Sequence, residues 1–250
     1  MTQQPEPRSG FGALQARIRA VRERIAAAER RFGRSPGSVR LLAVSKTQPV
    51  PQLQAAWEAG LRSFGESYYQ EAEDKMQALA GLEIEWHFIG PIQSNKTRGI
   101  AQHFHWVHSV DREKIARRLD TQRPGHLPPL QVCLQVNIDR EPTKAGCLPE
   151  AVDALARYVS RCERLQLRGL MAIPAPTTDF GRQRAAFARL RTLAERLQAQ
   201  GLGLDTLSMG MSADLEAAIA EGATIVRVGT ALFGPREPHP TDARGAGDPG

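Results

Sequence analysis

The residue with the clearest chemical potential is Lys46, in the stretch Arg40–Thr47 (RLLAVSKT). Four apolar residues ahead of Ser45 and Lys46 predict a buried strand with the lysine at its C-terminal end. Side chains alternate along a strand, so Lys46 shares an otherwise apolar face with Leu42 and Val44. Partial burial lowers the pKa of an ammonium group, and a neutral amine is the form that makes a Schiff base with an aldehyde. The alternative is a strand-end lysine whose charge extends into water.

Two small, hydroxyl-bearing turns near the C-terminus are candidates for anion binding. Ser208–Ser212 (SMGMS) leaves a predicted strand and enters a helix, with Ser212 as the expected N-cap residue. Gly229 and Thr230 directly follow another predicted strand. Glycine permits close backbone approach, and the start of a helix offers N–H groups to an anion. These turns predict a phosphate cradle, and the alternative is ordinary capping and turn chemistry.

The elements that must position these residues alternate regularly. Strands and helices follow one another about eight times, after an extra amphipathic helix over residues 14–32. The predicted strands comprise residues 40–47, 62–65, 83–90, 105–110, 130–137, 167–173, 207–210 and 224–229. This pattern predicts a single closed (β/α)8 barrel of the TIM type, with active residues in the loops that follow the strands. The alternative is an open doubly wound sheet, but its first turn should be rich in glycine, and SKTQPV has none.

In a closed barrel the first and eighth strands are neighbours, so Lys46 is expected beside the phosphate cradle. An aldehyde that carries a phosphate fits both, and pyridoxal 5′-phosphate is the leading candidate. Alternation in the eighth strand places Arg227 on the same side as Gly229, so its side chain is expected to point into the barrel mouth. The alternative is that Arg227 pairs with a carboxylate elsewhere in the barrel. Asn137 and Met211 also lie where predicted strands end, and we include them among the candidate cofactor contacts.

Other reactive residue types have simpler explanations. His87 could act as an acid or base, but a core histidine with a satisfied ring is the simpler explanation. His103, His105 and His108 lie close together in the sequence and could suggest a metal, yet no carboxylate or cysteine lies at ligand spacing, so we assign no metal. The chain has three cysteines, an odd number without metal spacing, which predicts reduced thiols and a cytoplasmic protein.

Composition excludes several classes of protein. No apolar run reaches membrane-spanning length, and the N-terminus lacks the pattern of a signal peptide. The net charge of +6 could indicate a nucleic-acid surface, but the basic residues have no interleaved aromatic platform, so we favour a solvated helix face. Residues 1–10 and 235–250 are predicted to be disordered, which leaves one domain over residues 11–234.

The motifs together resemble a known family. VSKTQ, FGESYYQEA, EWHFIGPIQSNK, HSVD, LQVNIDREPTKAG, GLMAIP and LSMGMSADLEAAIAEGATIVRVGTALFG occur in the order typical of the pyridoxal phosphate homeostasis protein family. The resemblance covers about Leu14 to Gly234 and implies a barrel like the N-terminal domain of alanine racemase. It also implies that Lys46 forms the cofactor aldimine, that Ser212, Gly229 and Thr230 bind the phosphate, and that Arg227 lies near the pyridine ring.

The chain departs from the family pattern at two places. The family usually has Asn where this chain has Ser67, and His and Leu at the positions of Pro91 and Ile92. Serine lacks the reach of an amide, and proline lacks a backbone donor. The departures affect the expected ring contacts from the second and third strands, not the lysine or the phosphate cradle.

Three functions remain open from the sequence. The resemblance implies a monomeric carrier that buffers the cofactor and delivers it to apo-enzymes, without an established reaction. An amino-acid racemase of the alanine racemase type is the alternative, but it needs a second β domain, and only sixteen residues follow Gly234. A nucleic-acid or scaffold protein is the third.

Overall fold

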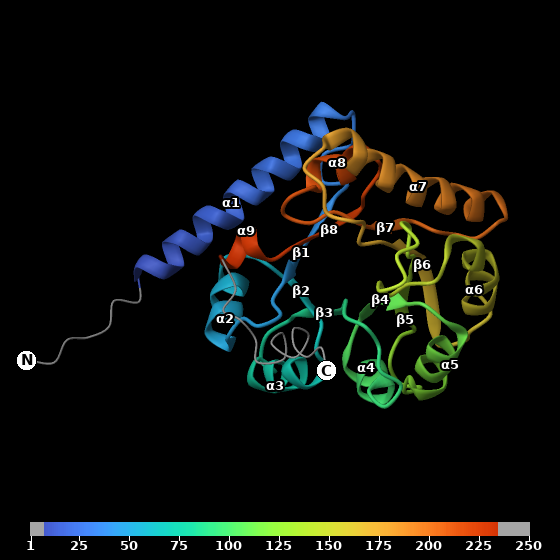
Figure 1. The fold of residues 1–250 in the computed structure, drawn as a ribbon. Coiled ribbons are helices and arrows are strands. Elements are labelled where there is room, and N and C mark those ends of the chain that lie inside the picture. Colours follow the sequence, from blue (N-terminus) through green and yellow to red (C-terminus); the bar gives the residue numbers. More distant parts are fainter. Residues whose placement is uncertain (1–7, 235–250) are drawn as a thin grey trace, which may run out of the picture.

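The computed structural model describes residues 8–234 as a barrel of eight parallel strands surrounded by helices (Figure 1). The strands are β1 (Arg40–Val44), β2 (Ser63–Glu66), β3 (Glu85–Phe88), β4 (Trp106–Val110), β5 (Leu130–Gln135), β6 (Leu165–Met171), β7 (Thr206–Ser208) and β8 (Ile225–Val228). They pair in sequence order, and β8 pairs with β1 to close the barrel. The predicted (β/α)8 barrel is therefore confirmed, and the open doubly wound sheet is excluded.

The helices lie outside the strands. They are α1 (Arg8–Arg31), α2 (Val50–Glu58), α3 (Tyr69–Ala78), α4 (Thr97–His103), α5 (Glu113–Gln122), α6 (Val152–Val159), α7 (Phe180–Ala199), α8 (Leu215–Ala220) and α9 (Thr230–Phe233). A short 3-10 helix (Pro149–Ala151) leads into α6, and Pro149 suits its first position because proline has no N–H to donate. Among residues 8–234, no helix is long and apolar enough to cross a membrane.

Alternation along the strands divides the apolar side chains between two cores. One set, including Ala43 and Phe64, packs between the strands and the helices. The other set comes from strands around the barrel and fills its interior: Leu42, Trp106, Cys133, Met171 and Ile225. The strands are therefore buried on both faces, which explains why they are almost continuously apolar in sequence.

The extra helix α1 packs against α8 and α9, across the end of the chain that carries the two hydroxyl turns (Figure 1). Its contact residues Leu14, Ile18, Val21 and Ile25 are at most 6% exposed, and their spacing is helical. The helix begins at Arg8, within the segment 1–10 for which disorder is predicted. Residues 1–7 and the predicted disordered tail 235–250 lie outside the described part of the chain.

The N-cap prediction for Ser212 is wrong. Ser212 does not cap α8, because the chain makes another turn and the helix begins after Asp214. That turn is closed by the Met211 N–H, which donates to Asp214 Oδ1 at 2.6 Å.

Candidate functional site

Lys46 lies in a turn just past the end of β1. The strand ends at Val44, earlier than predicted, although the Ser45 N–H still donates to Gly65 O of β2 at 3.0 Å. The Gln48 N–H then donates to Ser45 O at 3.0 Å, which reverses the chain. Within this turn Thr47 has φ of 65°, a left-handed conformation that costs a non-glycine residue about 1–2 kcal/mol. The half-buried lysine is therefore carried on a tight, locally strained turn at the C-terminal mouth of the barrel.

Three charged residues outside the predicted set of cofactor contacts hold this turn from outside the barrel. We call Glu66, Glu71 and Lys75 the Lys75 cluster. Lys75 Nζ donates to Ser45 O at 2.7 Å, to Glu66 Oε1 at 2.8 Å and to Glu71 Oε1 at 2.6 Å, which uses all three of its donors. Glu71 Oε1 also accepts from the Thr47 N–H at 2.5 Å. The cluster thus contacts the backbone on both sides of Lys46.

The cluster is buried, and this perturbs one of its carboxyl groups. The Glu66 side chain is fully buried, and only one of its oxygens has hydrogen-bond partners, Lys75 and the Ser45 hydroxyl at 2.6 Å. Burial raises the pKa of Glu66 to about 7, although the charge of Lys75 opposes the shift. Glu71 and Lys75 are four residues apart on the side of α3 that carries buried Ala72, and this spacing is typical of an ion pair along one helix face.

The two hydroxyl turns contact each other directly. Ser212 Oγ lies 3.4 Å from the backbone N of Ala231, so the loop after β7 touches the loop after β8 where Gly229 and Thr230 lie. Gly210 is required in this arrangement, because its φ is 93° and a Cβ there would lie 2.5 Å from the Cβ of Ala218. Gly210 thus allows the loop after β7 to pack closely on α8, and these two turns form one surface.

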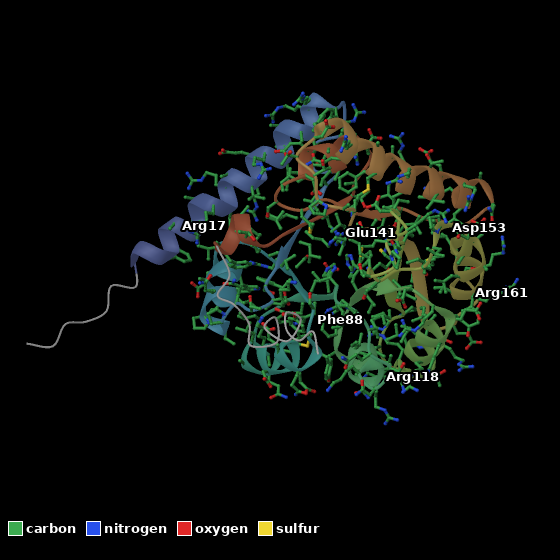
Figure 2. The ribbon with its side chains drawn as sticks, in the orientation of Figure 1. Arg17, Phe88, Arg118, Glu141, Asp153 and Arg161 are labelled. Carbon is green, nitrogen blue, oxygen red and sulfur yellow. The ribbon has the colours of Figure 1, made fainter. Side chains whose placement is uncertain are left out.

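Helix α1 supports this surface from behind. Arg24 donates from Nη2 to Ser212 O at 3.0 Å and pairs with Glu216 at 2.8 Å. Arg17 donates to Leu232 O of α9 at 2.6 Å, and Figure 2 shows its side chain beside that helix. Arg17 and Arg24 therefore bond other elements of the fold, whereas the sequence predicts a purely solvated helix face.

Pairing of β1 with β8 brings Lys46 and the hydroxyl turns to the same side of the mouth. Leu42 lies opposite Arg227 and Ala43 opposite Val228, so both strands reach the mouth one or two residues later. Arg227 is 3% exposed and is directed into the barrel, as alternation predicts. It donates to Ser208 O at 2.6 Å, to Ser208 Oγ at 2.8 Å and to Ala172 O at 2.9 Å. Burial lowers the pKa of its guanidinium to about 10, so it remains charged at neutral pH.

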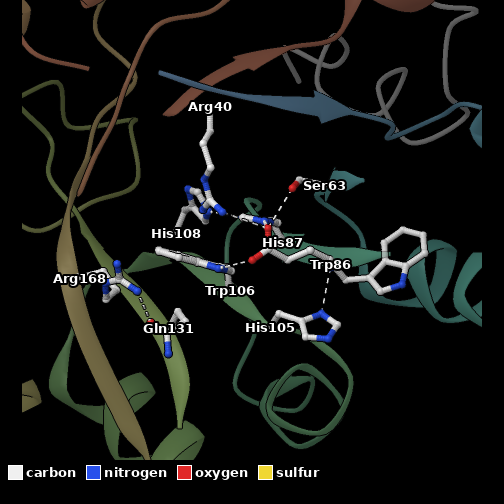
Figure 3. A network of polar contacts seen from close by, with 10 residues as sticks. Arg40, Ser63, Trp86, His87, His105, Trp106, His108, Gln131 and Arg168 are labelled. Carbon is white, nitrogen blue, oxygen red and sulfur yellow. Dashed lines mark hydrogen bonds and ion pairs between the residues drawn. The ribbon is translucent and has the colours of Figure 1, made fainter. Parts of the chain in front are cut away.

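A line of hydrogen bonds continues from Arg227 through the barrel interior. Ser208 Oγ lies 2.7 Å from His108 Nδ1, His108 Nε2 lies 2.9 Å from His87 Nδ1, and His87 Nε2 lies 3.0 Å from Glu85 Oε2. Figure 3 shows the lower part of this line, where His87 and His108 lie side by side above Trp106. His87 and His108 are therefore buried and hydrogen-bonded, in agreement with the simpler of the two explanations for His87.

The opposite end of the barrel is closed by paired charges. The guanidinium groups of Arg40 and Arg168 each lie 5.1 Å from the ring centroid of Trp106, whose Nε1 donates to Glu85 at 2.9 Å (Figure 3). A hollow of about 610 Å³ is present here, but its arginines already pair with Glu85 and Asp205. We therefore do not assign the site to this end, where barrels usually carry residues important for stability.

The remaining candidate residues are placed differently. Asn137 is buried, and its side-chain amide bonds the backbone of Glu141 and Lys144, so it shapes its own loop. Met211 lies on the rim of the mouth and is 38% exposed. Among residues 8–234, no group of three His, Cys, Asp or Glu could hold a metal ion. Burial raises the pKa of the Cys133 and Cys147 thiols to about 12, which makes both unreactive near neutral pH.

Comparisons with known proteins agree with this arrangement. The family described as alanine racemase, N-terminal domain, matches residues 16–237. A curated pyridoxal phosphate homeostasis protein from Pseudomonas aeruginosa is 62% identical over 220 residues, which are 88% of this chain and 94% of the relative. One from Escherichia coli is 50% identical over 87% of this chain and 94% of its own length.

Solved structures give the same result. The structure of PipY from Synechococcus elongatus with PLP bound superposes with a TM-score of 0.79 at 40% identity, over 88% of this chain and all of PipY. Alanine racemase from Corynebacterium glutamicum superposes with a TM-score of 0.65 over 90% of this chain and 62% of its own, but at 17% identity it shows the fold alone. The chain therefore belongs to the pyridoxal phosphate homeostasis protein family, built on the barrel of the alanine racemase N-terminal domain.

Proposed function

We propose that this protein binds pyridoxal 5′-phosphate through Lys46, buffers it and delivers it to enzymes that require it. The single observation that carries the proposal is the meeting of three features at one mouth: an amine on a tight turn, two touching hydroxyl turns and a buried arginine. The family's name and the PLP-bound PipY structure support the same ligand.

Each feature of the site suits one part of the cofactor. The cofactor supplies an aldehyde, to which the Lys46 amine adds with loss of one water, so that a C=N bond replaces C=O. Ser212, Gly229 and Thr230 would hold the phosphate with hydroxyl and backbone N–H donors. Arg227 would donate to the pyridine nitrogen, and Met211 would border the entrance. Asn137 would contribute through the loop that it shapes.

The proposal is for a carrier without turnover, in the cytoplasm. The three cysteines are free thiols, as a reducing compartment requires. The expectation of a monomer stays a prediction.

Reduction with borohydride tests the attachment. Protein loaded with pyridoxal 5′-phosphate should retain a pyridoxyl group on the peptide that contains Lys46, because reduction converts the C=N bond into a stable amine. Lys46→Met should abolish this label, and Lys114→Met, at an exposed lysine of α5, should not change it. A label on another lysine with Lys46 unmodified would contradict the proposal.

A further inference from the structure

We propose that Glu71 and Lys75 are positioning residues that hold the turn of Lys46 in the conformation from which its amine reaches the aldehyde. The inference rests on the proposed function and assigns a role to residues outside the cofactor contacts. Its observation is that one buried cluster bonds the backbone of both neighbours of Lys46, Ser45 and Thr47.

The Glu71 contact fixes the far side of the turn. Thr47 adopts φ of 65° without being glycine, so its conformation has to be maintained by surrounding contacts. The Thr47 N–H donates to Glu71 Oε1 at 2.5 Å, a charge-assisted bond that this conformation makes available. Without the carboxylate, the peptide between Lys46 and Thr47 loses the partner that orients it.

The Lys75 contact fixes the near side. Its ammonium lies between two carboxylates and Ser45 O, with no donor left over, and its side chain is only 5% exposed. Lys75 thereby ties α3 and the end of β2 to the end of β1. Ser45 O also accepts from the Gln48 N–H, so the same carbonyl closes the turn and joins it to the cluster.

A fixed turn matters because the reactive groups come from different elements. The phosphate and ring contacts of the proposed site come from the loops after β7 and from β8, whereas the amine comes from the loop after β1. Bond formation needs the amine and the aldehyde carbon close together and aligned, and rigid placement supplies this. Loosening the turn should therefore reduce covalent attachment and leave the phosphate contacts unchanged.

The experiment compares Glu71→Ala with Glu71→Gln, since glutamine keeps an oxygen that accepts from the Thr47 N–H. Each variant is titrated with pyridoxal 5′-phosphate and with pyridoxine 5′-phosphate, which has the same ring and phosphate but no aldehyde. Glu71→Ala should weaken binding of pyridoxal 5′-phosphate by about tenfold or more, which is the effect of losing a hydrogen bond to a charged group. Binding of pyridoxine 5′-phosphate should be unchanged. Glu71→Gln should recover most of the loss.

Amide hydrogen exchange at Thr47 gives a second readout without any ligand. Exchange should be slow in the wild-type protein and in Glu71→Gln, and fast in Glu71→Ala. Rapid exchange at Thr47 in the wild type would overturn the inference, and this measurement does not depend on a variant that folds. Equal weakening of the binding of both ligands in Glu71→Ala would also overturn it. If wild-type borohydride labelling misses Lys46, the proposed function fails with it; if Lys46 is labelled and the variants behave as wild type, only this inference fails.

Discussion

At the scale of single residues, burial sets the direction of the hydrogen bonds from Arg227 to Glu85, because it lowers the pKa of both histidines and keeps them neutral. A guanidinium only donates and a carboxylate only accepts, so both ends of the line are fixed. His87 therefore donates its Nε2–H to Glu85 and accepts at Nδ1 from His108 Nε2–H. His108 Nδ1 then accepts from the Ser208 hydroxyl, whose oxygen accepts from Arg227. Each neutral imidazole carries its proton on Nε2.

Burial stabilises these neutral forms. It lowers the pKa of His87 and lowers that of His108 well below 6.5, where the positive charges of Arg227 and Arg40 act in the same direction. Burial alone would raise the pKa of Glu85, but its hydrogen bond from His87 and the charge of Arg40 outweigh this and lower it. Glu85 therefore remains an acceptor, and the line keeps its direction.

We predict that nitrogen NMR of histidine-labelled protein shows the neutral Nε2–H form for both residues between about pH 5 and 8. The unfolded chain binds protons at these residues below pH 6.5, whereas the folded state does not. Their contribution to the free energy of unfolding is thus fully present above that pH and decreases as the pH falls below it. The same protein unfolded in urea is the control, and imidazolium signals from His87 or His108 in the folded protein at pH 6 would contradict the assignment.

At the scale of elements, α1 is a support for the two hydroxyl turns as well as a cover for the core. Its apolar stripe packs on α8 and α9, and its arginines bond the backbone of the turns and of α9. A helix placed before the first strand of the barrel thus stabilises the loops after the last two strands. The position of the proposed phosphate contacts depends on this packing.

Arg24→Met should therefore weaken binding of pyridoxine 5′-phosphate by about two- to fivefold, the modest effect expected of a half-exposed ion pair and one hydrogen bond. Isothermal titration calorimetry measures this. Arg22→Met is the matched control, because Arg22 lies on the same helix but bonds Gly60 O, away from the turns. Equal losses in Arg22→Met and Arg24→Met would show that α1 acts only through general stability.

Thr230→Val removes a hydroxyl from the proposed cradle and should weaken binding of pyridoxine 5′-phosphate by about tenfold in the same titration. Unchanged binding would show that the proposed cradle is misplaced.

At the scale of the whole molecule, the barrel has a mouth that carries the proposed site and an opposite, closed end. The mouth carries the amine and the hydroxyl turns, and the opposite end carries Trp106 between two arginines (Figure 3). Between them the interior is filled by apolar side chains and by the line from Arg227 to Glu85. Arg227 is therefore held as a permanent donor beneath the mouth.

The proposed contact between Arg227 and the pyridine nitrogen would suit holding a cofactor better than carbanion chemistry. A donor that faces the pyridine nitrogen disfavours its protonation, and the unprotonated ring is the weaker electron sink. We predict no racemisation of alanine above background by the loaded protein, measured by chiral chromatography with an authentic racemase as the positive control. Steady racemisation at about 1 per second or faster would contradict the proposed carrier function and favour an amino-acid racemase.

The sequence by itself determined the fold class and the two halves of the candidate site. Apolar runs separated by amphipathic segments depend on local periodicity, which is present in the chain before it folds, so the barrel and its order of elements could be predicted. Closure of the barrel then follows from the number of strands, and with it the proximity of Lys46 to Gly229 and Thr230. The element boundaries were predicted less accurately, since β1 ends at Val44 and the predicted strand extends to Thr47.

Only the tertiary structure decided which polar residues support the site. His108 and Ser208 are separated by 100 positions, and Lys75 and Ser45 by 30, so no local spacing connects them. Sequence patterns report which face of an element is apolar, whereas a buried charge is stable only where distant elements supply its partners. For that reason Glu71 and Lys75 read as ordinary helix-surface residues in the sequence, and become the contacts that hold the Lys46 turn once α3 packs against β1 and β2.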